Sequence, residues 1–333
     1  MRRIILLIVI LLAICYIVVS FTQIQSILDT LSKGNLPFLL IAILFECLCL
    51  FNNSVTYASL YRLVGLKEER WQLFLMSTAM TFVNMVTPTA GVGGMAVFLD
   101  SARQRKLSTA KVLVVGILYA LYEYTTLFFM VLLAFVVLLR RNDLNGGELT
   151  AAGILLLIML IEGAVLYLGY RSSAHLGKIL FTLAKWINHL MYRFFHRDLV
   201  APENAFKFSG EIADGVKALQ INPKKLVWPF LFSLNNKAIL LCVLAFTFLA
   251  LDTPYSIGTI VGGFSIGQLF YYVSPTPGGV GVVEGVYPIV LSSLRVPLSK
   301  ALLITLSYRA VTLWFPLLIG FFSFRILLKK QGV

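Results

Sequence analysis

The chain has 333 residues, of which 59% are hydrophobic and 13% are charged, and its mean hydropathy is +0.88. Soluble globular chains carry about 25% charged residues, so this composition excludes a soluble protein and predicts an all-α protein that crosses the membrane several times. The net charge of +13 does not indicate nucleic-acid binding, because no compact basic domain is present to carry it. Basic residues in membrane proteins instead mark cytoplasmic loops that meet anionic lipid.

Six apolar runs are long enough to cross a bilayer as helices. The first follows Met1-Arg2-Arg3 directly and is not followed by a signal-peptide cleavage site, so we expect it to be retained as a span. In chain order, the predicted spans are Ile4 to Val19, Leu36 to Tyr61, Val112 to Leu139, Leu149 to Tyr170, Leu226 to Leu251 and Leu298 to Leu328.

Two further apolar segments, Trp71 to Leu99 and Tyr255 to Leu294, are broken by proline and glycine. Proline removes a backbone donor and glycine weakens a helix, so no regular helix continues through either break. Irregular backbone at membrane depth persists only where protein buries it or where it lines a wet cavity. We therefore expect the breaks to shape a binding site through Pro88, Gly91, Gly93, Gly94, Pro275, Pro277, Gly278, Gly279 and Gly281.

Three matched patterns, in the same order and at a nearly constant offset, indicate a duplicated unit. The offset is 187 residues for Val-x-Pro-Thr-x-Gly at the two breaks, 186 for Tyr-x-x-x-Thr-Leu-x-Phe after them, and 183 for Asn-Asn before them. Each unit is a span, a broken hairpin and a span. Within a single membrane domain, repeat 1 covers about 36–139 and repeat 2 about 226–328, and the segment 171–225 between them contains two amphipathic helices, Leu176 to Phe195 and Phe206 to Leu219.

The distribution of basic residues decides between two topologies. If each broken hairpin is re-entrant and the N-terminus is inside, 21 Lys and Arg residues lie in the cytoplasm and 5 outside; if each break crosses once, the numbers are 10 and 16. The positive-inside rule favours the re-entrant topology, which has both termini in the cytoplasm. The two hairpins then enter from opposite sides, and such inverted repeats are the architecture of many secondary transporters.

Seven charged side chains lie in or beside the apolar runs, where a charge costs at least about 2.5–3.5 kcal/mol and is expected to be paired. The repeat superposes Glu123 on Arg309, so we predict either an ion pair between these two or a pair between Arg309 and Glu284. Whichever pair forms, it has one of two roles: it contacts a substrate, or it only fixes the register of the helices. The seven residues are Glu46, Asp100, Glu123, Glu162, Lys237, Glu284 and Arg309.

Asparagines and glycines near the breaks each allow two interpretations. Asn235 and Asn236, like Asn52 and Asn53, either bond carbonyls freed by the breaks or join neighbouring helices. The glycines of 278–281 either offer backbone N–H groups to an anionic headgroup at the start of a half-helix or allow close helix packing.

No metal site, cofactor site or catalytic constellation is predicted. The four cysteines lie inside apolar runs, and the three histidines share one polar segment without cysteines or carboxylates at ligand spacing. We therefore do not expect an enzyme.

The run Pro275-Thr-Pro-Gly-Gly-Val-Gly-Val-Val-Glu284 resembles the signature of the lysylphosphatidylglycerol synthase transmembrane-region family, also called UPF0104. Asn84 and the spacing of Pro88 to Gly94 resemble the family's first-repeat motif, and the resemblance covers about Ile4 to Leu328. The chain departs from the family at Met95, where members often carry a carboxylate. In the multiple peptide resistance factor this region is the flippase half, so the resemblance implies lipid translocation and not lipid synthesis.

We therefore expect a flippase of the cell inner membrane that moves an anionic or aminoacylated phospholipid between leaflets. Two alternatives stay open. One is a non-catalytic membrane partner of a separate lipid-modifying or glycosyl-transferring enzyme, and the other is a small-solute or ion antiporter. Membrane phospholipid is the expected partner, nucleic acid is not, and self-association is left open.

Overall fold

The computed structural model describes residues 35–87, 93–141, 144, 146–195, 201–219 and 223–330. Within these ranges the protein is built from helices and contains no strand, which confirms the predicted all-α class. The predicted first span, Pro88 and Gly91 lie outside the described residues.

Five helical segments of the described chain are long and apolar enough to cross a membrane, and they coincide with five of the predicted spans. The last of them is one continuous helical rod interrupted by a π turn, η3 (Ala310–Trp314). Pro37 lies in the first turn of the first of these five segments. Backbone N–H groups there have no partner within the helix, so the missing N–H of proline costs no helical hydrogen bond. The five are α2 (Leu36–Leu63), α5 (Thr109–Leu139), α6 (Gly146–Arg171), α9 (Val227–Ala250) and the rod formed by α12 (Leu298–Arg309), η3 and α13 (Phe315–Lys330).

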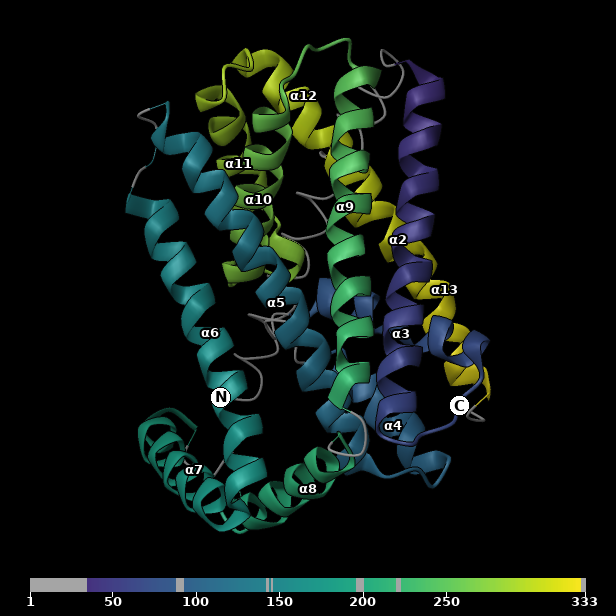
Figure 1. Ribbon diagram of the computed structural model, residues 1–333, viewed down its shortest axis with the longest axis vertical. Coiled ribbons are helices and arrows are strands. Elements are labelled where there is room, and N and C mark those ends of the chain that lie inside the picture. The colour runs from purple at the N-terminus through teal and green to yellow at the C-terminus, as the bar shows by residue number, and fades with distance from the viewer. Residues whose placement is uncertain are drawn as a thin grey trace.

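Each half of the bundle contains a helical hairpin interrupted at the predicted break. In the first half, α3 (Arg70–Val86) precedes the break and α4 (Met95–Gln104) follows it. In the second half, α10 (Ile257–Val273) is followed by the short 3-10 turn η2 (Pro277–Gly279) and by α11 (Val282–Ser293). Figure 1 shows α3 and α4 toward one end of the long axis and α10 and α11 toward the other.

The two halves interlock through their long helices. Helix α2 packs along α9, while α13 packs on α3 and α5 packs on α10, so each hairpin is held by the last helix of the other half. Asn235 donates from Nδ2 to Asn52 Oδ1 at 3.0 Å, and Asn52 Nδ2 donates to the Phe232 carbonyl at 2.8 Å. Of the two interpretations given above, these two asparagines therefore join neighbouring helices.

The end of α3 packs against the second break inside the bundle. Met85 at the end of α3 is buried with Val280 and Leu313, and a Cβ at Gly278 would lie 3.3 Å from the Met85 carbonyl oxygen. Gly278 has φ +57°, a left-handed conformation that L side chains rarely adopt, so both its backbone and its surroundings favour glycine. The second break is thus buried against the first half, as irregular backbone in an apolar bundle requires.

The segment between the halves forms the two predicted amphipathic helices, α7 (Ser173–Phe195) and α8 (Asn204–Leu219). They pack on one another and cross the end of the bundle where α4 lies (Figure 1). Leu176 and Ile212 are buried, whereas Trp186 is 62% exposed, so one face of this pair covers the bundle and another is left uncovered by the described residues.

The close packing of α10 against α11 gives a stability test. A Cβ at Gly267 would lie 2.9 Å from the ring of the buried Tyr287, whereas a Cβ at Gly285 of α11 would meet nothing within 4 Å. We predict that Gly267→Val lowers the free energy of unfolding by about 1–3 kcal/mol because it overpacks the hairpin. Gly285→Val is the matched control and should leave the melting temperature in detergent nearly unchanged. Equal melting temperatures for both variants would contradict this packing.

Candidate functional site

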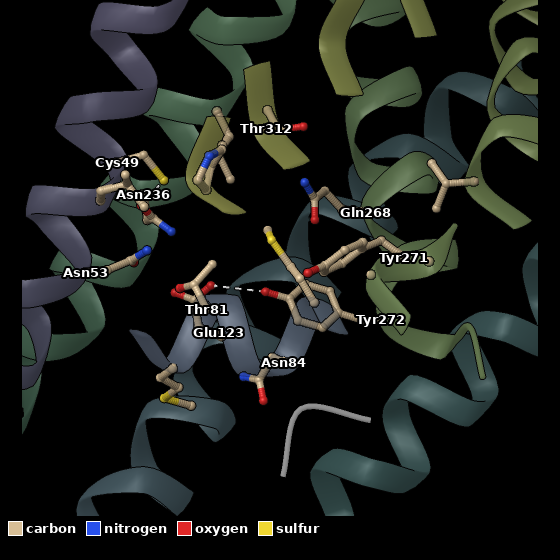
Figure 2. A pocket seen from close by; sticks show the side chains of 18 of the residues that line it. Cys49, Asn53, Thr81, Asn84, Glu123, Asn236, Gln268, Tyr271, Tyr272 and Thr312 are labelled. Carbon is tan, nitrogen blue, oxygen red and sulfur yellow. Dashed lines mark hydrogen bonds between the residues drawn. The ribbon is translucent and has the colours of Figure 1, made fainter. Parts of the chain in front are cut away.

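A cavity of about 230 Å³ lies between the end of α3 and the second break. Its wall contains residues of α2, α3 and α5 from the first half, and of α9, α10 and α12 from the second, together with Gly278 and Gly279 of the second break. Figure 2 shows the side chains of Asn53, Asn84 and Tyr272 around this space, each from a different helix. The lining mixes amides, hydroxyls and tyrosines with apolar groups, so the cavity is suited to a polar ligand.

The first buried ion pair joins Glu123 of α5 to Lys237 of α9, with 2.5 Å between Oε2 and Nζ. The Ser233 hydroxyl donates to Glu123 Oε1 at 2.5 Å, and the Tyr272 hydroxyl donates to Oε2 at 3.5 Å (Figure 2). The ammonium also lies 5.6 Å from the centroid of the Tyr272 ring. Both charges are almost fully buried, so each neutralises the other in surroundings where a lone charge is costly.

The second ion pair joins Arg309 of α12 to Glu284 of α11, with 2.7 Å between Nε and Oε1. Arg309 also donates from Nη2 to the Gly278 carbonyl at 2.6 Å, and Glu284 Oε2 accepts the Gly281 backbone N–H at 2.7 Å. The pair therefore fastens the second break to α12. Arg309 is the last residue before the π turn η3, and π turns inside helices often mark functional sites.

The structure selects between the two predicted pairings of Arg309. Arg309 pairs with Glu284, as one prediction stated, while Glu123 pairs with Lys237, a partner that the repeat did not identify. Lys237 was visible as a charge inside an apolar run. The sequence did not identify the partner of Lys237, because the repeat aligns residues of the two halves but does not show which helix faces contact one another.

Equivalent glycines follow the two breaks and are capped by different side chains. Gly94 and Gly281 are 187 residues apart, and their N–H groups donate at 2.7 Å to Asn84 Oδ1 and Glu284 Oε2, respectively. The Gly281 amide is therefore engaged within the protein instead of being open to an anion. A Cβ at Gly94 would lie 2.6 Å from the Met80 carbonyl oxygen, so this glycine also permits close packing of α4 on α3.

The remaining predicted residues divide between the cavity and its frame. Asn236 lines the cavity and accepts a hydrogen bond from Cys49 Sγ at 3.0 Å, whereas Asn235 belongs to the contact between α2 and α9. Gly279 lines the cavity with φ +69°. Pro277 begins the turn η2, and Pro275 is exposed in the link before it.

The start of α4 follows the first break. The Gly93 carbonyl accepts the Ala96 N–H at 3.1 Å in its first turn. Met95, where family members often carry an acid, packs against Gly116 of α5. Asp100 accepts a hydrogen bond from Gln104 Nε2 on the exposed side of α4, and it does not line the cavity.

Three residues that line the cavity were not among the predicted site residues. Tyr271 and Tyr272 bring their rings near Arg309 and Lys237, respectively, and Glu46 of α2 is buried at the cavity wall. Glu46 was recognisable as a carboxylate in an apolar run, but nothing in the pattern showed which way it faces. Among the described residues, no group of three or more His, Cys, Asp or Glu side chains is placed to hold a metal ion.

The buried ion pair gives a second test. We predict that Lys237→Met lowers the free energy of unfolding by about 3–5 kcal/mol, because it leaves Glu123 buried and uncompensated. Adding Glu123→Gln should restore most of the loss, since the double variant buries no lone charge; both are measured by thermal unfolding in detergent. Lys217→Met, which removes the exposed pair with Asp214, is the control and should cost less than about 1 kcal/mol. A double variant as unstable as Lys237→Met alone would contradict the assignment.

The comparison with known families agrees with the architecture. The family model for the lysylphosphatidylglycerol synthase TM region matches residues 4–320, which include the first predicted repeat, most of the second, both breaks and both ion pairs. No curated protein matches the chain. Because the match covers nearly the whole chain, the protein is a membrane protein of the lysylphosphatidylglycerol synthase transmembrane-region family, UPF0104.

Proposed function

We propose that the protein is a lipid flippase that binds a phospholipid headgroup in the cavity between the two breaks and moves it between leaflets of the cell membrane. The observation that carries this proposal is the cavity itself, which is lined by helices of both halves and flanked by one buried and one partly buried ion pair. Membership of the family supports a membrane role, and the geometry of the site supports the substrate class.

The size of the cavity favours a headgroup over a whole lipid. Its volume of about 230 Å³ is below the ~300–1,000 Å³ of pockets that enclose drug-sized ligands. The acyl chains would remain in the bilayer, against the apolar side chains that the spans expose, such as Leu133, Leu157 and Leu318. Only the polar part of the lipid then needs a path through the protein.

The two ion pairs provide a way to exchange partners with a charged headgroup. A phosphate competes with Glu284 for Arg309, whose guanidinium suits phosphate oxygens, and with Glu123 for Lys237. An amine on the headgroup competes in the same way for the carboxylates. For a headgroup that carries both a phosphate and an amine, binding replaces each ion pair by another, so no lone charge has to be buried. A purely anionic headgroup instead brings one additional negative charge into the cavity.

Movement of the second break would accompany this exchange. Arg309 holds the break through the Gly278 carbonyl and through Glu284, so loss of the pair frees both contacts at once. The glycines at 278, 279 and 281, all with positive φ, and the π turn after Arg309 are places where backbone angles can change.

For the orientation in the membrane, we propose that the hairpins are re-entrant from opposite sides, that both termini are cytoplasmic, and that α7 and α8 lie against the cytoplasmic leaflet. The support is the distribution of basic residues given above, together with the positions of the hairpins at opposite ends of the bundle (Figure 1).

Removing the charge of Glu284 tests the proposed site. In vesicles containing a fluorescent anionic phospholipid, Glu284→Gln should lower the translocation rate at least about tenfold, which corresponds to ~1.4 kcal/mol, because the partner exchange at Arg309 is lost. The amide still accepts the Gly281 N–H, so the start of α11 is retained. Glu284→Ala should have at least the same effect. Glu203 is an exposed residue directly before α8, and Glu203→Gln is the control that should keep the wild-type rate. Wild-type rates in both Glu284 variants would remove this residue from the mechanism.

Cysteine labelling tests the orientation. In a background whose four native cysteines are replaced by alanine, Arg295→Cys lies in the turn between α11 and α12, and Lys106→Cys in the turn between α4 and α5. We predict that a membrane-impermeant maleimide labels the first in intact cells and the second only after permeabilisation. The reverse pattern would contradict the proposed orientation.

A further inference from the structure

Among the described residues that line the cavity, Glu46 is the carboxylate whose charge is not balanced by the contacts described above. It lies in the middle of α2, its side chain is 3% exposed, and it lines the cavity. Its Oε2 atom is fully buried and has no hydrogen-bond partner, and none of the ion pairs found among the described residues includes it. A buried acid that faces a cavity and has no cation as its partner is unusual, and the packing of the helices does not require it.

The cations closest to the cavity are committed elsewhere. Arg309 is held by Glu284 and by the Gly278 carbonyl, and Lys237 is held by Glu123. The other titratable groups that act electrostatically on Glu46 are Cys47 and Cys49 of α2, Tyr271 of α10 and Tyr308 of α12. The one charged residue of α3 is Arg70, which lies at the end of that helix away from the cavity. None of these groups neutralises a carboxylate at Glu46.

Burial then decides the state of this carboxyl group. In each ion pair one carboxylate balances one cation, so an ionised Glu46 would leave the cavity with one unbalanced negative charge. An isolated ionised carboxylate is so costly in an apolar interior that such groups take up a proton instead. Contact with water removes most of that cost, so an opened cavity favours release of the proton.

We propose that Glu46 is a proton site of the transport cycle, and that a proton on Glu46 enters the cavity together with an anionic headgroup. This inference rests on the proposed function. A phosphate beside an ionised Glu46 would add a second uncompensated negative charge to the cavity, whereas a neutral carboxyl donates a hydrogen bond to a phosphate oxygen. Lipid and proton therefore bind together from one side, with COO⁻ and H⁺ giving COOH, and both leave when the cavity opens to the other side.

A pH gradient across reconstituted vesicles tests the coupling. With a fluorescent phosphatidylglycerol as the probe, acidifying the side that supplies the lipid should raise the translocation rate of the wild type several-fold over the rate at equal pH. Glu46→Gln keeps the shape of the side chain and imitates the neutral acid, so it should translocate at a rate that no longer responds to the gradient. Glu162→Gln is the matched control, because Glu162 is an intramembrane acid of α6 outside the cavity lining, and it should respond like the wild type.

Infrared spectroscopy of the purified protein in lipid gives a readout that does not depend on transport. The carbonyl stretch of protonated carboxylic acids should include a component that is lost in Glu46→Gln and retained in Glu162→Gln, with both variants eluting as the wild type does in size-exclusion chromatography. An unchanged band in Glu46→Gln, or a gradient response equal to that of the wild type, would overturn the proton site. Failure of the wild type to move any probe would instead refute the proposed flippase activity, and the infrared band would still decide whether Glu46 holds a proton.

Discussion

The Arg309 guanidinium is the interaction on which the second half of the bundle depends. It binds Glu284 at 2.7 Å and the Gly278 carbonyl at 2.6 Å, and Glu284 in turn accepts the Gly281 N–H. An apolar environment offers no water for the carbonyl and N–H groups that a broken helix leaves open. One side chain from α12 therefore neutralises a partly buried acid and binds a carbonyl of the break, and this allows irregular backbone to lie next to a cavity.

The two halves share their order of helices but differ in their chemistry. At equivalent glycines the first half uses the neutral Asn84 and the second half uses Glu284. At another pair of equivalent positions the first half has Glu123 and the second has Arg309, and each finds its partner in the second half of the chain. A symmetric frame with asymmetric charges therefore gives the cavity two different ion pairs.

Much of this architecture was predictable from sequence, because hydrophobic length, proline and glycine are local signals. They located five described spans, the helix ends on either side of each break, and the amphipathic pair. The Arg309–Glu284 pair was one of two stated options. The partner of Glu123 and the exposure of Glu46 to the cavity were not predictable, because both depend on how α2, α5 and α9 are rotated about their axes. That rotation is set by packing over sequence distances of more than 100 residues, such as the 114 that separate Glu123 from Lys237.

The central claim is that a lipid headgroup occupies the space between the two breaks. The most direct measurement is an experimental structure of the protein in lipid, determined with and without an added anionic phospholipid. Our account predicts headgroup density inside the cavity, with its phosphate near Arg309 or Lys237 and its acyl chains passing between helices into the bilayer. Lipid density confined to the outer surface of the bundle, with both ion pairs unchanged and the cavity holding only water, would contradict it.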